Sequence, residues 1–369
     1  MKRFCFLIFL LAALLFLPEK AFCQKIYLSP SGNDFNQGTP EKPLATLTAA
    51  CNMARQIRKT AFTGGPVEII ALPGEYFMMQ PLLLTVDDSG TEASPLIIKA
   101  EKGTKAVFKG GVELTGFEKV NDRLWRCFVP QVGWYDSYFE QLYVNGRRAK
   151  RARTPDEGFF TVKNVTESVL EKGTGRSPLL AVQKIDLDTS AYLCFTNFSD
   201  DDYRDALIIF YHSWDNTRKR ILGYSRETSS IYIAGEGMKP WNPLNSKSRY
   251  YIENYRSALD SPGEWYLDRS GYLYYIPLEG ETIENTKFIA PVIEDMILIS
   301  GESVDKKVSY IRFENLSFQC SGYRTPADGN EPAQAAAPLG AAITLDFASN
   351  IDFVECEIAH TGTYAVWFR

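Results

Sequence analysis

Residues 310–319 read YIRFENLSFQ, and residues 350–359 read NIDFVECEIA. The two segments align without a gap, and a short apolar strand precedes each of them, MILIS before the first and AITLDF before the second. Repeats that are built of short strands are typical of a solenoid, in which successive coils stack and bury one continuous core. The apolar positions that coincide are Ile311 with Ile351, Phe313 with Phe353, Leu316 with Cys356, and Phe318 with Ile358.

Polar residues mark the turns of this repeat. Asn315 and Asn350 fall near the predicted turns, where asparagine is favoured because its side chain bonds the local backbone. We expect each side-chain amide to bond the equivalent residue of the next coil. The sequence therefore predicts coils that stack in register at the C-terminal end of the chain.

The N-terminal part of the chain combines one helix with short strands. Residues 47–57 have apolar positions at helical spacing, and the segment at 67–77, VEIIALPGEYF, contains strands broken by proline and glycine. No long helical pattern returns further along the sequence. We predict that the helix caps one end of the solenoid. Its apolar positions are Leu47, Cys51, Ala54 and Ile57.

The middle of the chain, residues 118–285, has longer, aromatic strands that alternate in polarity. Asn145-Gly146 in QLYVNGRRAKRAR is the strongest two-residue signal for a β-hairpin, and a second hairpin is expected at 268–271 in GEWYLDRSGYLYYIP. We predict an antiparallel β domain here, inserted between residues 24–117, which form the cap and first coils, and residues 286–369, which form later coils.

The C-terminal residues read as the first strand of a further coil. An open solenoid end exposes unpaired backbone groups and core side chains, so native solenoids cover it with a cap. We therefore expect this sequence, which stops at Arg369, to be the N-terminal portion of a longer protein.

Residues 1–23 have the features of a secretory signal peptide. Lys2 and Arg3 precede an apolar run at 4–17, and Ala-Phe-Cys before Gln24 fits a small-x-small cleavage site. A lipid anchor on Cys23 is the alternative, although the residues before it make a poor lipobox. We predict a secreted or periplasmic protein that does not associate with a membrane once the signal is cleaved, because no later stretch is apolar enough to span one.

Composition excludes several classes of function. The net charge of −5 provides no positive field for nucleic acid. The cysteines beyond the signal are odd in number and widely spaced, which predicts buried thiols and not a disulfide framework. Histidine and cysteine lack the spacing of metal ligands, and nucleotide-binding motifs are missing, so we predict no metal and no cofactor. The five cysteines are Cys51, Cys127, Cys194, Cys320 and Cys356.

Four segments carry a resemblance to a known family. They are IYLSPSGNDFNQGTPEKPLATLTAA at 26–50, EQLYVNGRRAKRARTPD at 140–156, SPGEWYLDRSGYLYYIP at 261–277 and SYIRFENLSF at 309–318. Together they resemble secreted bacterial proteins of glycoside hydrolase family 141, including the insertion domain of that family. The resemblance implies an all-β fold, a right-handed parallel β-helix of the pectate-lyase type, and activity on plant cell-wall polysaccharide such as pectin or xylan.

The same resemblance implies that the catalytic carboxylates lie on later coils, beyond residue 369, so the catalytic residues of this chain are unknown. Hydrolysis needs two carboxyl groups, about 5–5.5 Å apart for retention or about 6.5–9.5 Å apart for inversion. Glu355 and Glu357 in FVECEIA would project from one strand about 6.6–6.8 Å apart. Alternating glutamates are also the ordinary solvated face of a strand, and we favour that interpretation.

Candidates for sugar binding lie in the last coils and in the two hairpins. His360 follows a strand, where it would reach a sugar hydroxyl or, alternatively, bond a backbone carbonyl. The arginines of RRAKRAR at 147–153 would either clamp the carboxylate of a uronate sugar or form a solvated strand with acidic partners. Trp265 would stack on a sugar ring or pack within its hairpin. The predicted substrate-binding residues are His360, Asp346, Tyr364, Trp265, Arg148 and Arg153.

Three hypotheses of function follow. The first is the N-terminal part of a secreted glycoside hydrolase whose partner is a polysaccharide or oligosaccharide substrate. The second is a polysaccharide lyase on the same fold, which would use Ca²⁺ and an arginine or lysine base near a uronate. The third is a non-catalytic carbohydrate-binding or surface protein.

Overall fold

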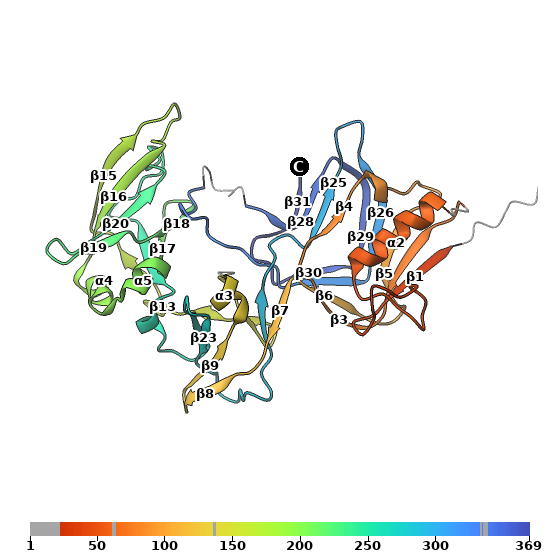
Figure 1. Cartoon of the computed structure of the whole chain (residues 1–369). Coiled ribbons are helices and arrows are strands. Elements are labelled where there is room, and N and C mark those ends of the chain that lie inside the picture. Colours follow the sequence, from red (N-terminus) through yellow and green to blue (C-terminus); the bar gives the residue numbers. More distant parts are fainter. Residues whose placement is uncertain (1–22, 61–63, 136–137, 333, 335–338) are drawn as a thin grey trace, which may run out of the picture.

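The computed structural model describes residues 23–60, 64–135, 138–332, 334 and 339–369 (Figure 1). The predicted signal peptide lies almost entirely outside these residues. Within them the fold consists mainly of β-strands, arranged as parallel sheets at one side of the molecule and mostly antiparallel sheets at the other. No helix in the described ranges is long and apolar enough to cross a membrane.

The described residues form three parallel sheets, which the chain visits in turn. Residues 67–109 pass through the first, second and third sheets and return to the first and second, and residues 297–368 continue from the third sheet in the same order. The first sheet contains β1 (Gln24–Leu28), β2 (Val67–Ala71), β5 (Leu96–Ala100), β26 (Val308–Glu314) and β29 (Ala348–Val354), the second contains β3 (Gly74–Phe77), β6 (Ala106–Lys109), β27 (Leu316–Gln319) and β30 (Glu357–Ala359), and the third contains β4 (Leu82–Leu84), β25 (Ile297–Ser300), β28 (Ala341–Asp346) and β31 (Tyr364–Phe368).

The pairing register confirms the repeat found in the sequence. Ile311 lies opposite Ile351, and Phe313 lies opposite Phe353, in the pair β26–β29, while Phe318 lies opposite Ile358 in β27–β30. The rings of Phe313 and Phe353 stack nearly parallel, with centroids 4.8 Å apart and an interplanar angle of 6°. Equivalent apolar side chains therefore form columns through the core between the three sheets.

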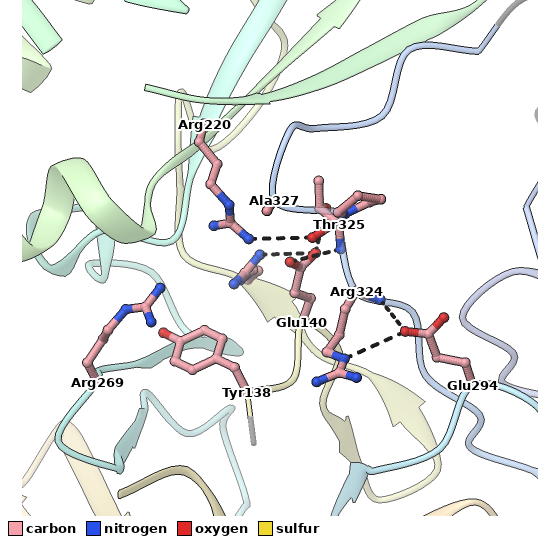
Figure 2. A pocket seen from close by; sticks show the side chains of 10 residues that line it. Tyr138, Glu140, Arg220, Arg269, Glu294, Arg324, Thr325 and Ala327 are labelled. Atoms are coloured by element: carbon pink, nitrogen blue, oxygen red, sulfur yellow. Dashed lines mark hydrogen bonds and ion pairs between the residues drawn. The ribbon is translucent and has the colours of Figure 1, made fainter. Parts of the chain in front are cut away.

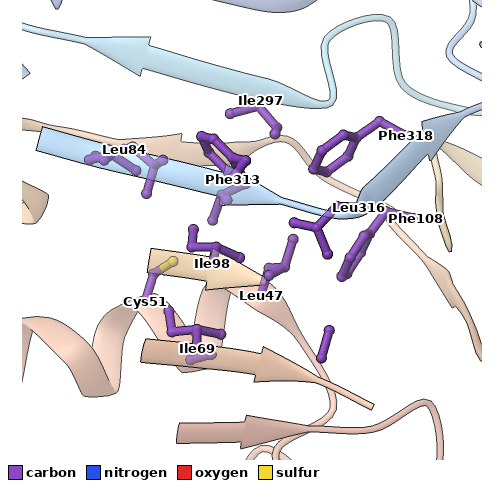
Figure 3. Packing of buried hydrophobic residues seen from close by; sticks show 14 of the residues in the cluster. Leu47, Cys51, Ile69, Leu84, Ile98, Phe108, Ile297, Phe313, Leu316 and Phe318 are labelled. Atoms are coloured by element: carbon purple, nitrogen blue, oxygen red, sulfur yellow. The ribbon is translucent and has the colours of Figure 1, made fainter. Parts of the chain in front are cut away.

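The predicted helix is confirmed as α2 (Leu47–Thr60), with a 3₁₀ turn, η1 (Val86–Asp88), beside it. The Thr46 hydroxyl accepts a hydrogen bond from the Ala49 amide at 3.1 Å, as a helix N-cap does. Leu47 and Cys51 are buried against the same cluster as Ile69 and Ile98 (Figure 3). Burying this face of α2 covers core side chains that the first strands would otherwise expose to water.

The segment between β6 and β25 leaves the parallel sheets and returns to them. Its two ends pair with each other, because β7 (Gly111–Leu114) runs antiparallel to β24 (Phe288–Pro291). We call residues 111–291 the inserted part. Its remaining elements are β8 (Glu118–Asn121), β9 (Leu124–Phe128), α3 (Pro130–Tyr135), β10 (Tyr143–Val144), β11 (Arg147–Arg148), β12 (Lys150–Arg151), β13 (Arg153–Thr154), β14 (Phe160–Thr161), β15 (Asn164–Glu171), β16 (Leu180–Asp186), α4 (Thr189–Cys194), η2 (Phe195–Asn197), α5 (Asp200–Asp205), β17 (Leu207–Tyr211), β18 (Asn216–Arg220), β19 (Gly223–Ser225), β20 (Ser230–Gly235), β21 (Arg249–Glu253), η3 (Arg256–Ala258), β22 (Glu264–Leu267) and β23 (Tyr272–Tyr275).

Both predicted hairpins are present in the inserted part. Asn145 and Gly146 have φ of 49° and 73° and join β10 to β11, as expected for a two-residue turn with positive φ at both positions. The pair β22–β23 forms the second hairpin, with Trp265 opposite Tyr275. The inserted part has hydrophobic clusters of its own, one around Phe210 and one around Trp265, separate from the cluster between the parallel sheets.

Two local predictions are wrong. Glu355 and Glu357 do not share a strand, because β29 ends at Val354 and Glu355 is a corner residue with φ of 52°. The Asn315 side chain does not bond an equivalent asparagine but donates to the Thr104 carbonyl at 2.8 Å. In both cases a corner with positive φ interrupts the alternation that the sequence pattern implied.

Candidate functional site

One segment from the parallel sheets reaches across to the inserted part. We call residues 320–332, which follow β27, the connecting segment. Gln141 bonds the Tyr323 backbone twice, by accepting from the amide at 2.6 Å and by donating to the carbonyl at 2.8 Å. Further along, Arg218 and Asn330 exchange two backbone hydrogen bonds of 2.9 and 2.8 Å. These bonds hold the connecting segment against the inserted part at two points.

A cavity of about 480 Å³ lies where the connecting segment meets the inserted part (Figure 2). We call it the arginine pocket, because four guanidinium groups line it. Its walls come from the start of the inserted part, from β12, from the end of β18, from the β22–β23 turn and from the connecting segment. The lining residues are Tyr138, Glu140, Arg151, Arg220, Arg269, Glu294, Arg324, Thr325, Pro326 and Ala327.

Glu140 lies at the centre of the pocket and is buried. Its carboxylate accepts hydrogen bonds from the Thr325 amide at 3.1 Å and from the Thr325 hydroxyl at 2.8 Å. Arg151 Nη1 lies 3.8 Å from the same carboxylate. Glu140 thus joins the connecting segment to β12 of the inserted part.

Arg151 is the most deeply buried arginine of the pocket, with a side chain 7% exposed. Pairing of β12 with β22 places it opposite Trp265, whose ring lies 5.7 Å from its guanidinium. Its Nη1 lies 3.3 Å from Glu253, which Arg218 also contacts at 3.3 Å. Its Nε has no hydrogen-bond partner among the described residues. A buried donor without a partner costs about 1–3 kcal/mol.

The other arginines surround this centre. Arg269 pairs with the buried Asp205 at 2.5 Å, and its guanidinium lies 5.4 Å from the Tyr138 ring. Burial raises the pKa of Asp205, although the neighbouring Arg269 lowers it in part. Arg220 donates to the Thr325 carbonyl at 3.5 Å (Figure 2).

The rim of the pocket is more open than its centre. The exposed Arg324 lies 3.7 Å from the half-buried Glu294 there, and the Arg324 amide donates to Glu294 at 3.1 Å. The pocket therefore offers many hydrogen-bond donors and a few carboxylate acceptors. Such a combination can bind the oxygens of a polar, ring-shaped ligand.

Two candidates predicted from the sequence lie in structural positions. Trp265 is fully buried, stacks on Phe139 with centroids 5.7 Å apart, and leaves no face of its ring open to a sugar. Arg153 lies 3.7 Å above the Tyr251 ring and donates to two backbone carbonyls, of residues 155 and 158. The structure brings neither residue's polar group into the arginine pocket.

Four other candidates lie near the last strands. The His360 carbonyl accepts a hydrogen bond from the Tyr143 hydroxyl at 2.6 Å, and Tyr143 pairs with Arg148 across the first hairpin. Arg148 lines a second cavity, of about 280 Å³, together with Gly362. The structure therefore brings His360 and Arg148 to the same region. The remaining candidates contact other residues, Asp346 by pairing with Arg369 at 3.2 Å and Tyr364 by meeting Trp367 edge-on at 5.6 Å.

In the described part of the chain, one carboxylate cluster has the geometry of a metal site, formed by Asp156, Asp260 and Glu264. Its members already have partners. Ser261 donates to Asp156 at 2.5 Å and to Asp260 at 3.1 Å, and Lys150 lies 3.3 Å from Glu264. Lys150 thus offsets part of the negative charge of this cluster.

The pocket residues other than Arg151 were not predicted from the sequence. Arg151 lies within RRAKRAR, and the small residues Ala149 and Ala152 around it are a sign of close packing. Tyr138, Arg220 and Arg324 come from distant segments with no shared motif. Only the tertiary structure brings them together.

No protein-family model matches the chain, and no curated protein sequence matches it. Among solved structures, the chain is similar to one described as a glycoside hydrolase, with 29% sequence identity and a TM-score of 0.79, covering 93% of this chain and 63% of that one. Two further structures have much lower similarity. A structure of XylC with xylose has 13% sequence identity and a TM-score of 0.38, covering 93% of this chain and 41% of that one. The Gp54 tailspike of Acinetobacter baumannii bacteriophage AP22, in complex with A. baumannii capsular saccharide, has 10% identity and a TM-score of 0.18, covering 86% of this chain and 42% of that one. The first likeness is thus to a glycoside hydrolase, and this chain spans 63% of that neighbour's length.

Proposed function

We propose that this chain is the N-terminal part of a secreted glycoside hydrolase that acts on plant cell-wall polysaccharide, pectic or xylan-type. The observation that carries the proposal is the 29% identity and TM-score of 0.79 to a glycoside hydrolase across 93% of the chain. The catalytic carboxylates are proposed to lie beyond residue 369. The resemblance to family 141 found in the sequence supports the same assignment.

We further propose that the parallel sheets are coils of a right-handed parallel β-helix, capped by α2. The passage of the chain through three parallel sheets in a constant order supports this architecture. The separate hydrophobic clusters support an inserted domain at about residues 118–285, between first coils at 24–117 and later coils at 286–369.

The arginine pocket is the proposed contribution of this chain to substrate binding. Ligand sites typically enclose about 300–1,000 Å³, and this cavity measures about 480 Å³. Sugar hydroxyls both donate and accept hydrogen bonds, so the guanidinium groups and the two glutamates would serve as their partners.

Glu357, in the last strands, does not suit general acid catalysis. The Ser317 hydroxyl donates to Glu357 at 2.7 Å and thereby lowers the pKa of this carboxyl. A general acid in glycoside hydrolysis needs a raised pKa, so that it holds its proton at the working pH. This supports placing the catalytic pair elsewhere in the protein.

Incubating the natural secreted protein with pectin and xylan, and measuring reducing ends and bound saccharide, tests the proposal. Release of reducing ends without new ultraviolet absorbance is the expected result. Binding without turnover would favour a non-catalytic carbohydrate-binding protein, and products that absorb as unsaturated uronides would favour a lyase. Failure to bind any plant polysaccharide would overturn the proposal.

A further inference from the structure

The charges of the arginine pocket leave one guanidinium without a carboxylate. Arg151, Arg269 and Arg324 each have a carboxylate oxygen within 3.8 Å. Arg220 has no ion-pair partner among the described residues, and its contact in the pocket is a long hydrogen bond to the Thr325 carbonyl. A single positive charge is therefore available for a ligand.

A second observation also points to a ligand. The Arg151 side chain is 93% buried and lines the pocket, yet its Nε donor has no partner in the described structure. Buried donors are almost always satisfied by protein, water or ligand. No described residue supplies this partner.

We propose that the arginine pocket binds the carboxylate of a uronate residue in the polysaccharide, an inference that rests on the proposed function. A sugar carboxylate brings one negative charge, which matches the single unpaired guanidinium. It also brings two coplanar oxygens, which match the planar donor fork of arginine. Arg220 would bind this group, beside the buried guanidinium of Arg151.

The rest of the pocket fits the remainder of such a residue. Glu140 and Glu294 offer acceptors for ring hydroxyls, and the Tyr138 ring offers an apolar face. Exposed Arg324 lies at the rim, where the next residues of the polysaccharide would pass. The proposed uronate site is therefore the pocket around Arg151. Two other arginines of the same arginine-rich segment, the exposed Arg148 and the structural Arg153, do not belong to it.

Calorimetric titration of the natural secreted protein with an oligogalacturonide, its methyl ester and a sulfated galactan oligosaccharide tests the inference. The Arg220→Gln variant keeps a donor for Thr325 but loses the charge. We expect it to weaken binding of the oligogalacturonide about tenfold to hundredfold, because hydrogen bonds to charged groups contribute about 1.5–3 kcal/mol. Binding of the methyl ester is expected to be weaker than that of the acid and unchanged by the substitution.

Arg204→Gln is the matched control, because Arg204 is exposed on α5 and does not line the pocket. If Arg220→Gln does not fold, the exposed Arg324→Gln variant replaces it, with an expected loss of at least threefold. Equal affinity for acid and ester, stronger binding of the sulfated oligosaccharide, or a loss caused by Arg148→Gln instead would overturn the inference while the proposed function stands. Failure of all three ligands and of neutral xylan to bind would instead overturn the proposed function.

Discussion

Replacing Phe313 by alanine is expected to destabilise the parallel sheets and leave the inserted part intact. The Phe313 side chain is fully buried, stacks on Phe353 at 4.8 Å, and meets Phe318 edge-on at 6.1 Å. Phenylalanine-to-alanine changes in cores cost about 3–5 kcal/mol, and paired rings add to the loss. Because two ring contacts disappear and the neighbouring strands cannot collapse without losing register, we expect about 4–5 kcal/mol.

Urea unfolding followed by peptide-resolved hydrogen exchange measures this effect. With a urea dependence of about 3 kcal/mol per M, the expected loss moves the midpoint by about 1.3–1.7 M for peptides from 308–319. Five of the six tryptophans lie in residues 118–285, so fluorescence reports mainly on the inserted part. Its midpoint is expected to stay in place, whereas the matched variant Phe210→Ala, in the core of the inserted part, should shift it.

Two results would refute the reasoning. A shift below a third of the expected value at 308–319 would mean that the column of apolar side chains does not carry the stability of the parallel sheets. Equal shifts of the exchange and fluorescence midpoints would mean that the hydrophobic clusters unfold as one cooperative unit.

Three further predictions concern single residues. Burial raises the pKa of Glu264, so the folded state holds the carboxyl proton more tightly than the unfolded chain does. The stability that this proton contributes is therefore lost as pH rises from about 4.3 through the folded pKa. The Glu264→Gln variant should show a smaller fall of the urea midpoint over this pH range. Gly146→Ala meets no neighbour but keeps φ at 73°, so it should cost about 1 kcal/mol and lower Tm by about 2–4 °C, and an unchanged Tm would contradict the turn. Burial raises the pKa of Cys127 to about 12 and that of Cys320 to about 11, so neither should react with a thiol reagent until the protein unfolds.

Sequence reasoning predicted those parts of the fold that depend on local pattern. Stacked coils must align equivalent apolar side chains, so the match between 310–319 and 350–359 fixed the register of β26–β29. The two-residue turn at Asn145-Gly146 was predictable because few residues adopt positive φ at both positions. The corner at Glu355 was missed because the segment reads as an unbroken alternation, although the repeat aligns Glu355 with Asn315, whose φ is also positive.

The arginine pocket depends on contacts that no local pattern encodes. Arg148, Arg151 and Arg153 are chemically alike and close in sequence, yet only Arg151 is buried with carboxylates. The pairing of β12 with β22 decides this difference, and it joins residues more than 100 positions apart. Trp265 is a residue type that often stacks on sugar rings, but the pairing of β12 with β22 places it in the core.

The antiparallel pair β7–β24 at the base of the inserted part bears on the order of folding. The contact between Leu96 in β5 and Ile311 in β26 closes a loop of about 215 residues, at an entropic cost of about 4.7 kcal/mol. Once β7 and β24 have paired, only about 35 residues of free chain remain in that loop, and the cost falls to about 3.1 kcal/mol. If the inserted part folds first, it therefore serves as a clamp that brings the early and late strands together, and closure becomes about fifteenfold more favourable. Until the inserted part has folded, β5 remains an unpaired edge strand, which can pair with another chain. The folding rate of the inserted part therefore sets how long a newly made chain is prone to aggregation.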